Sequence, residues 1–124
     1  MTSHNNSARA FFNILIDPWL AGTQTDGTPL VSKQWHRDPP ACGSIAEVVA
    51  LIKREQSKDG SRQLIEDVQT DGLGYIDAVF VSHEFTDHMH QSTLLQLNPE
   101  IPVYATPVSF LAKFPLRKSL TYDL

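Results

Sequence analysis

Residues 76–90, IDAVFVSHEFTDHMH, constrain the fold more than any other part of the sequence. The apolar run at residues 78–81 is typical of a strand that is buried within a parallel sheet. It leads directly into five side chains that can bind metal ions, namely His83, Glu84, Asp87, His88 and His90. Because α/β proteins usually place functional groups at the carboxyl ends of parallel strands, we expect the functional site here.

Length and composition fit one small globular domain. The chain has 124 residues, of which 41% are hydrophobic and 19% charged. Its net charge of −4 argues against broad binding to phosphate backbones, so we expect no nucleic-acid partner. The apolar run at residues 11–20 is too short and too polar to span a membrane. A single cysteine, Cys42, and the lack of a secretory signal pattern predict a reducing, cytoplasmic setting.

Strand and loop patterns occupy the first third of the chain. Residues 1–10 are rich in Ser and Asn, which predicts a flexible lead-in to a domain at residues 11–124. FFNILID, residues 11–17, predicts a strand that stops before Pro18, because proline cannot continue the hydrogen-bonded ladder. Residues 19–43 contain several Gly and Pro and predict a long loop.

The clearest helix signal begins at Ser44. Ser44 and Glu47 have the spacing of a capping box, in which each side chain accepts a hydrogen bond from a free backbone N–H. The apolar positions that follow repeat with the period of a helix and predict one face packed on a sheet: Ile45, Val48, Val49 and Ile52. The pattern ends near Arg54, and residues 55–62 predict a polar connector.

Shorter elements flank the ligand-rich stretch. We expect a helical turn at residues 64–68, a chain break at 71–74 and, after the ligands, a short helix at 92–97. A strand at residues 102–105 and a helix at about 106–113 follow. Strands that alternate with helices in this order predict an α/β fold with a mainly parallel sheet.

His83, Asp87 and His88 are the residue types that bind zinc. A catalytic zinc site typically uses three His or carboxylate ligands and keeps one position open for water. The metal lowers the pKa of that water to about 7 and so produces hydroxide at neutral pH. The spacing of the three residues places them on one loop at the end of the predicted strand.

The same segments resemble the metallo-β-lactamase-fold hydrolases, whose signature H-x-H-x-D-H follows a hydrophobic strand. SHEFTDHMH, residues 82–90, resembles this signature, and NILIDPWL, residues 13–20, resembles the family's earlier strand that ends in Asp. IPVYATP, residues 101–107, resembles the strand that leads away from the metal loop. The resemblance implies a zinc-dependent hydrolase, with one or two zinc ions, that acts on a small-molecule ester, lactone, amide or phosphoester.

Carried over residue by residue, the resemblance assigns a role to four side chains. His83 corresponds to a ligand of the first metal, and Asp87 and His88 correspond to ligands of the second. Asp87 is also the catalytic candidate, because the family's aspartate helps to orient the attacking water. Asp17 corresponds to the aspartate that holds the ligand loop in place from behind.

Two departures separate this chain from the family pattern. Phe85 stands where the family has its second histidine, and a phenylalanine side chain offers no lone pair to a metal. No histidine follows His90 before the end at Leu124, although the family takes further ligands from later segments. The resemblance therefore implies an incomplete domain, a partial metallo-β-lactamase-like fold that corresponds to one half of the αββα sandwich.

Three functions follow from these observations. The first is the zinc-dependent hydrolase, in a truncated form that is either active or inactive as this chain. The second is a non-catalytic fragment or degenerate relative that acts, if at all, by association, including self-association through an uncovered apolar sheet face. The third is an unrelated small α/β binding domain with a complete sheet.

Overall fold

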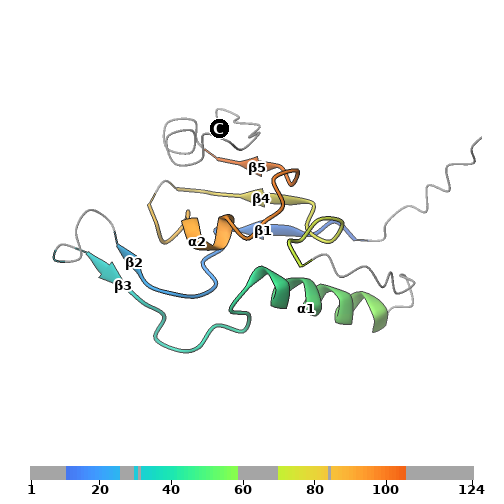
Figure 1. Cartoon of the computed structure of the whole chain (residues 1–124), viewed down its shortest axis with the longest axis horizontal. Coiled ribbons are helices and arrows are strands. Elements are labelled where there is room, and N and C mark those ends of the chain that lie inside the picture. The colour runs from blue at the N-terminus through green and yellow to red at the C-terminus, as the bar shows by residue number, and fades with distance from the viewer. Residues whose placement is uncertain (1–10, 26–29, 31, 59–69, 84, 106–124) are drawn as a thin grey trace, which may run out of the picture.

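The computed structural model describes residues 11–25, 30, 32–58, 70–83 and 85–105 (Figure 1). These residues form a small α/β protein with a three-stranded parallel sheet, a two-stranded antiparallel sheet and two helices. The expected lead-in at residues 1–10, helical turn at 64–68 and helix at 106–113 lie outside the described residues. In the part of the chain that is described, no helix is long and apolar enough to cross a membrane.

The main sheet has the order β1–β4–β5. β1 (Ile14–Ile16) and β5 (Val103–Tyr104) both pair in parallel with the central strand β4 (Ala78–Phe80). Figure 1 shows β4 between the other two strands. The predicted α/β class and mainly parallel sheet are thus confirmed. β1 ends where expected, because Asp17 adopts a left-handed φ of 46° and turns the chain out of the strand.

A short hairpin interrupts the segment that we expected to be a loop at residues 19–43. β2 (Gln24–Thr25) pairs with β3 (Lys33–Gln34) in an antiparallel two-stranded sheet. The hairpin lies apart from the main sheet (Figure 1). The expectation of a continuous loop was wrong, because strands of two residues are too short to produce an alternating apolar pattern.

The helix α1 (Ile45–Lys58) begins at the predicted cap. The Ser44 hydroxyl accepts a hydrogen bond from the Glu47 N–H at 3.2 Å, as the capping box requires. The Glu47 carboxylate instead accepts from the N–H of Gly43 at 2.7 Å, one residue earlier than predicted. Both bonds satisfy backbone donors at the entry to α1.

The last turn of α1 was missed by the sequence pattern, which ended near Arg54. Residues 55–58 are helical and not part of a connector. Lys58 donates to the Glu55 carboxylate at 2.9 Å across this turn, on the exposed side of the helix. The predicted end of the helix was too early, because apolar periodicity does not mark a turn that is held mainly by exposed polar side chains.

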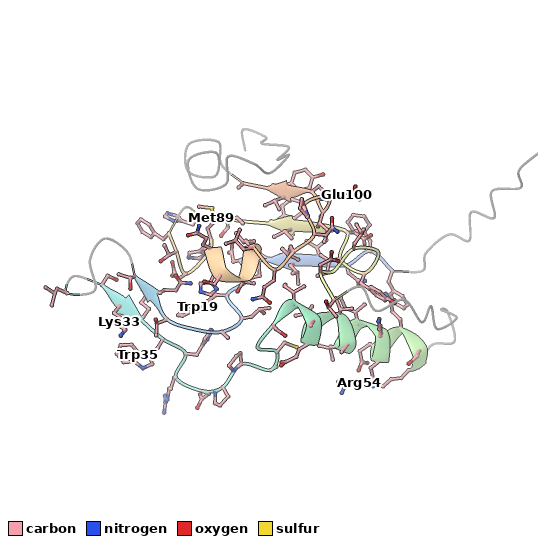
Figure 2. The ribbon with its side chains drawn as sticks, viewed as in Figure 1. Trp19, Lys33, Trp35, Arg54, Met89 and Glu100 are labelled. Carbon is pink, nitrogen blue, oxygen red and sulfur yellow. The ribbon has the colours of Figure 1, made fainter. Side chains whose placement is uncertain are left out.

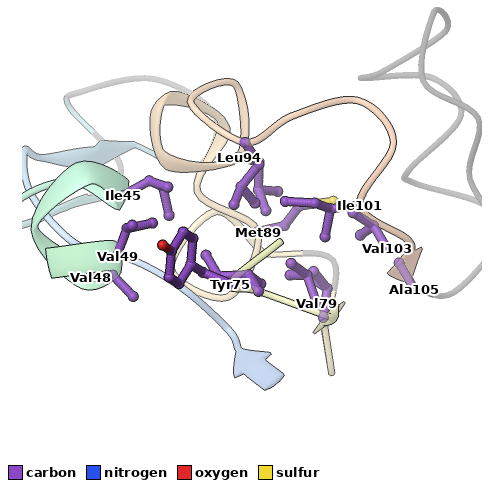
Figure 3. Close-up of a cluster of buried hydrophobic side chains, with 13 residues drawn as sticks. Ile45, Val48, Val49, Tyr75, Val79, Met89, Leu94, Ile101, Val103 and Ala105 are labelled. Carbon is purple, nitrogen blue, oxygen red and sulfur yellow. The ribbon is translucent and has the colours of Figure 1, made fainter. Parts of the chain in front are cut away.

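The core lies between one face of the main sheet and both helices (Figure 3). Val79 and Val103 are paired in register and buried on that face. The predicted stripe of α1 joins the same cluster at its other end, beside Tyr75 (Figure 3), with Ile45 fully buried and Ile52 partly buried against the cluster. α2 (Gln91–Leu94) adds Leu94, which is 0% exposed. α2 is shorter than the expected helix at 92–97. After Leu94 the chain continues in turns, with hydrogen bonds from the N–H of Gln96 to the Thr93 carbonyl and from the N–H of Leu97 to the Leu94 carbonyl.

The opposite face of the main sheet is apolar and exposed. Ile14 and Ile16 of β1 are 45% and 70% exposed, and Phe80 of β4 is 37% exposed. Ile16 and Phe80 are register partners, and the Phe80 ring stacks on Tyr104 of β5 with centroids 4.8 Å apart. We call this set, Ile14, Ile16, Phe80 and Tyr104, the open sheet face.

Candidate metal centre

The carboxyl ends of β1 and β4 meet at one edge of the main sheet. Backbone hydrogen bonds continue past the strands, from Asp17 N–H to the Phe80 carbonyl and from Val81 N–H to the Tyr104 carbonyl, both at 2.9 Å. Parallel pairing therefore brings Asp17 beside the segment that begins at Ser82, although the two are separated by more than 60 residues.

The Asp17 carboxylate contacts two residues at this edge, Ser82 and His88. One carboxylate oxygen, Oδ1, accepts from the Ser82 N–H at 2.7 Å. The other, Oδ2, accepts from the Ser82 hydroxyl and lies 3.0 Å from Nδ1 of His88. Asp17 therefore contacts two residues of the segment that follows β4, and it lies at one edge of the His88 imidazole.

The pKa values of Asp17 and His88 are shifted in opposite directions. Partial burial acts to raise the pKa of Asp17, but hydrogen bonds from Ser82 and His88 outweigh it and leave the pKa below its usual value. The hydrogen bond to Asp17 raises the pKa of His88 against a smaller effect of burial, and the charges of Asp87 and Asp17 add to the rise. The pair therefore stabilises ionised Asp17 and protonated His88, and His88 must lose its Nε2 proton before that nitrogen can bind a metal ion.

Asp87 and His88 leave two donor atoms free for a cation. Nε2 of His88 lies on the ring edge away from Asp17 and is 3.6 Å from Oδ2 of Asp87. Oδ1 of Asp87 is buried and has no hydrogen-bond partner. A buried carboxylate oxygen without a partner is unfavourable unless a proton or a cation satisfies it, so Oδ1 of Asp87 is an atom at which a bound cation would be stabilised.

His83 does not complete this pair in its present orientation. Its ring centroid lies 5.6 Å from that of His88, but its Nδ1 accepts the N–H of Phe85 at 3.1 Å. The proton of the neutral ring is then on Nε2, which leaves that nitrogen without a lone pair for a metal. Among the described residues, no group of three or more potential ligands is placed to hold a metal ion.

The two remaining candidates in the stretch are Glu84 and His90. Glu84 lies outside the described residues. His90 occupies the N-cap position of α2 and is only 4% exposed, with Nδ1 at 2.6 Å from the Thr93 hydroxyl oxygen. Burial lowers the pKa of His90, with a further contribution from His36. His90 is thus a core residue, separate from Asp87 and His88.

Ser82 is a member of this site that the sequence analysis missed. The only signal was its place at the end of the central strand, one residue before His83. Its hydroxyl lies 3.4 Å from Nδ1 of His88 but donates to Asp17, so Ser and Asp share the same edge of the imidazole. A serine nucleophile needs the hydroxyl and the carboxylate on opposite ring nitrogens, so this geometry does not form such a triad.

Comparisons with protein-family models, curated proteins and solved structures returned no match for this chain. The resemblance drawn from residues 13–20 and 82–90 therefore stays a prediction. The described residues form a small α/β protein with a mostly parallel sheet. A cluster of polar side chains lies where the parallel strands end.

Proposed function

We propose that this chain is a zinc-dependent hydrolase of the metallo-β-lactamase type, built on a partial form of that fold. Zinc would be held by Asp87 and His88. The observation that carries the proposal is the 3.0 Å contact between Oδ2 of Asp17 and Nδ1 of His88. Histidines that bind metals usually donate their other ring N–H to a carboxylate, which fixes the tautomer and the ring orientation.

Each residue has a separate task in this proposal. Asp17 keeps the proton of His88 on Nδ1 and so leaves the Nε2 lone pair for the metal. Asp87 would bind the zinc ion through its carboxylate and would help to orient the attacking water. The zinc ion, when bound, supplies the acidity that makes water a nucleophile at neutral pH. His83 can join as a ligand once it gives up its hydrogen bond with Phe85.

Zinc binding tests the proposal. We expect purified protein to take up roughly one equivalent of zinc, and His88→Ala or Asp87→Asn to weaken binding by about tenfold or more, since each removes a ligand. Metal analysis and titration against a chromogenic chelator measure this, followed by hydrolysis assays on ester, lactone, amide and phosphoester probes. His36→Ala is the control, because it also removes a histidine, but one whose ring contacts Trp19, with ring centroids 4.2 Å apart, and is not a proposed ligand. Zinc well below one equivalent that is unchanged by His88→Ala would contradict the proposal.

The open sheet face supports a second candidate, self-association with another copy of the chain. Its four side chains carry no charge. The same face of a second copy is therefore a compatible partner, whereas a charged surface would lose hydration against it. We expect Ile16→Glu to shift the protein toward monomer, because Ile16 is 70% exposed in the strand β1. Analytical ultracentrifugation over a concentration series measures this. Leu95→Glu is the matched control, at a 66% exposed position next to α2. A wild-type protein that is monomeric at all concentrations would exclude this candidate.

A further inference from the structure

Ser82 contacts both oxygens of the Asp17 carboxylate. Its backbone N–H donates to Oδ1 at 2.7 Å, and its hydroxyl donates to Oδ2. Because the two donors belong to one residue and reach different oxygens, they fix the orientation of the carboxylate as well as its position. Oδ2 is also the oxygen that lies 3.0 Å from Nδ1 of His88. The Ser82 hydroxyl therefore acts on the same oxygen that contacts the imidazole.

The backbone of Asp17 is an independent sign that its position is imposed by its surroundings. In the described part of the chain, Asp17 is the only residue other than glycine with a positive φ, of 46°. It also precedes Pro18, and a residue before proline normally adopts an extended conformation. Such backbone conformations persist where neighbouring contacts hold them, often at functional sites. The bonds from Ser82 tie this unusual turn to the segment that follows β4.

The chain segments that carry Asp17 and His88 continue past the site toward α2. Figure 2 shows Trp19 and Met89 close to α2. Trp19 follows Asp17 by two residues, and Met89 follows His88 by one. This arrangement brings the two segments together, but a single hydrogen bond to Oδ1 would still let Oδ2 swing out of line with the imidazole. The Ser82 hydroxyl supplies the second bond that holds Oδ2 in line.

The position of Ser82 argues against a role in packing. Ser82 is exposed, so loss of its hydroxyl leaves no cavity in the core. Its hydroxyl oxygen lies 3.4 Å from Nδ1 of His88, which is longer than a good hydrogen bond. Ser82 therefore acts on His88 mainly through the Asp17 carboxylate.

We propose that Ser82 is a positioning residue, which aims Oδ2 of Asp17 at Nδ1 of His88 and so keeps the proton of the neutral ring on Nδ1. Nε2 of that ring then has the lone pair that a metal ion requires. The consequence for metal binding rests on the proposed hydrolase function, whereas the contact itself requires no metal. The tautomer of His88 and the zinc affinity therefore test separate parts of the proposal.

Nitrogen-15 NMR of the full chain without metal measures the His88 tautomer at about pH 9, well above the usual pKa of histidine. We expect wild type and Ser82→Thr to carry the ring proton mainly on Nδ1. Ser82→Ala and Ser82→Val should shift the population toward the tautomer with the proton on Nε2. Threonine and valine have the same shape and differ in the hydroxyl, so this pair isolates the hydrogen bond. Ser92→Ala, at an exposed serine of α2, should match wild type.

Zinc titration measures the consequence for the proposed metal site. Ser82→Ala should weaken zinc binding by about three- to tenfold, the usual effect of losing one hydrogen bond, and Ser82→Thr should restore the wild-type affinity. The loss should disappear in an Asp17→Gly background. Glycine tolerates the positive φ at this position and removes the carboxylate through which Ser82 acts.

Two results would overturn the proposal. One is a wild-type tautomer population in both Ser82→Ala and Ser82→Val, and the other is an equal loss of zinc affinity from Ser82→Ala with and without the Asp17 carboxylate. Failure of the wild-type protein to take up zinc would contradict the proposed hydrolase function. The tautomer of His88 in the metal-free variants would still decide whether Ser82 positions Asp17.

Discussion

Replacing Leu94 with alanine is expected to lower the free energy of unfolding by roughly 2–5 kcal/mol, because the substitution empties a fully buried position in the core. Leu94 is 0% exposed and lies in the cluster formed by both helices and the main sheet (Figure 3). Removal of its isobutyl group loses apolar burial and leaves a cavity that the surrounding residues cannot fill completely. A small domain is stable by only about 5–15 kcal/mol, so the variant should be close to unfolding.

The next residue in the chain is the matched control. Leu95 is 66% exposed, and Leu95→Ala should change the free energy of unfolding by about 0.5 kcal/mol or less. Urea denaturation followed by circular dichroism compares the two variants on the same scale. Similar losses for Leu94→Ala and Leu95→Ala would show that α2 does not pack on the sheet as described.

Asp17→Asn is expected to change both the metal affinity and the pH dependence of stability. The amide cannot provide the charge that holds the His88 proton on Nδ1, so zinc affinity should fall by about 10–100-fold. The fall should occur without loss of a ligand atom, because the substitution leaves Asp87 and His88 in place. Zinc titration at pH 7 measures this effect directly.

The sign of the pH effect follows from the two pKa shifts. The raised pKa of His88 stabilises the fold fully below about pH 6.5, its unfolded value, and this contribution is lost as the pH rises through the folded pKa. The lowered pKa of Asp17 stabilises the fold above about pH 3.8, and this contribution is lost as the pH falls through the folded pKa. Metal-free wild type should therefore exceed Asp17→Asn in stability most clearly between about pH 4 and 6.5.

Urea unfolding of the metal-free proteins at several pH values checks this window. Asp77→Asn is a suitable control, because Asp77 also accepts a backbone N–H, from Asn13 at 2.7 Å, and it precedes β4, whereas His88 follows it. Its stability relative to wild type should show no loss as the pH rises above 6.5. A constant difference between wild type and Asp17→Asn across the whole range would contradict an ion pair with His88.

Much of the main sheet and the first helix could be predicted from local patterns. The run at residues 78–81 is apolar because β4 is central and covered on one face by both helices. Ser44 and Glu47 mark the start of α1, since a helix needs acceptors for its first N–H groups wherever it occurs. The hairpin and the last turn of α1 could not be predicted in this way, because neither carries an apolar period.

By itself, the sequence determined which chemical groups stand at the end of the central strand, because residue identity and strand direction are both local properties. Only the tertiary structure decided how those groups are used. Parallel pairing brings Asp17 to His88, and the turn after β4 directs His83 to the N–H of Phe85. Folding also placed both donors of Ser82 on the Asp17 carboxylate, a contact that no local pattern announced, because it joins segments that lie far apart in the chain.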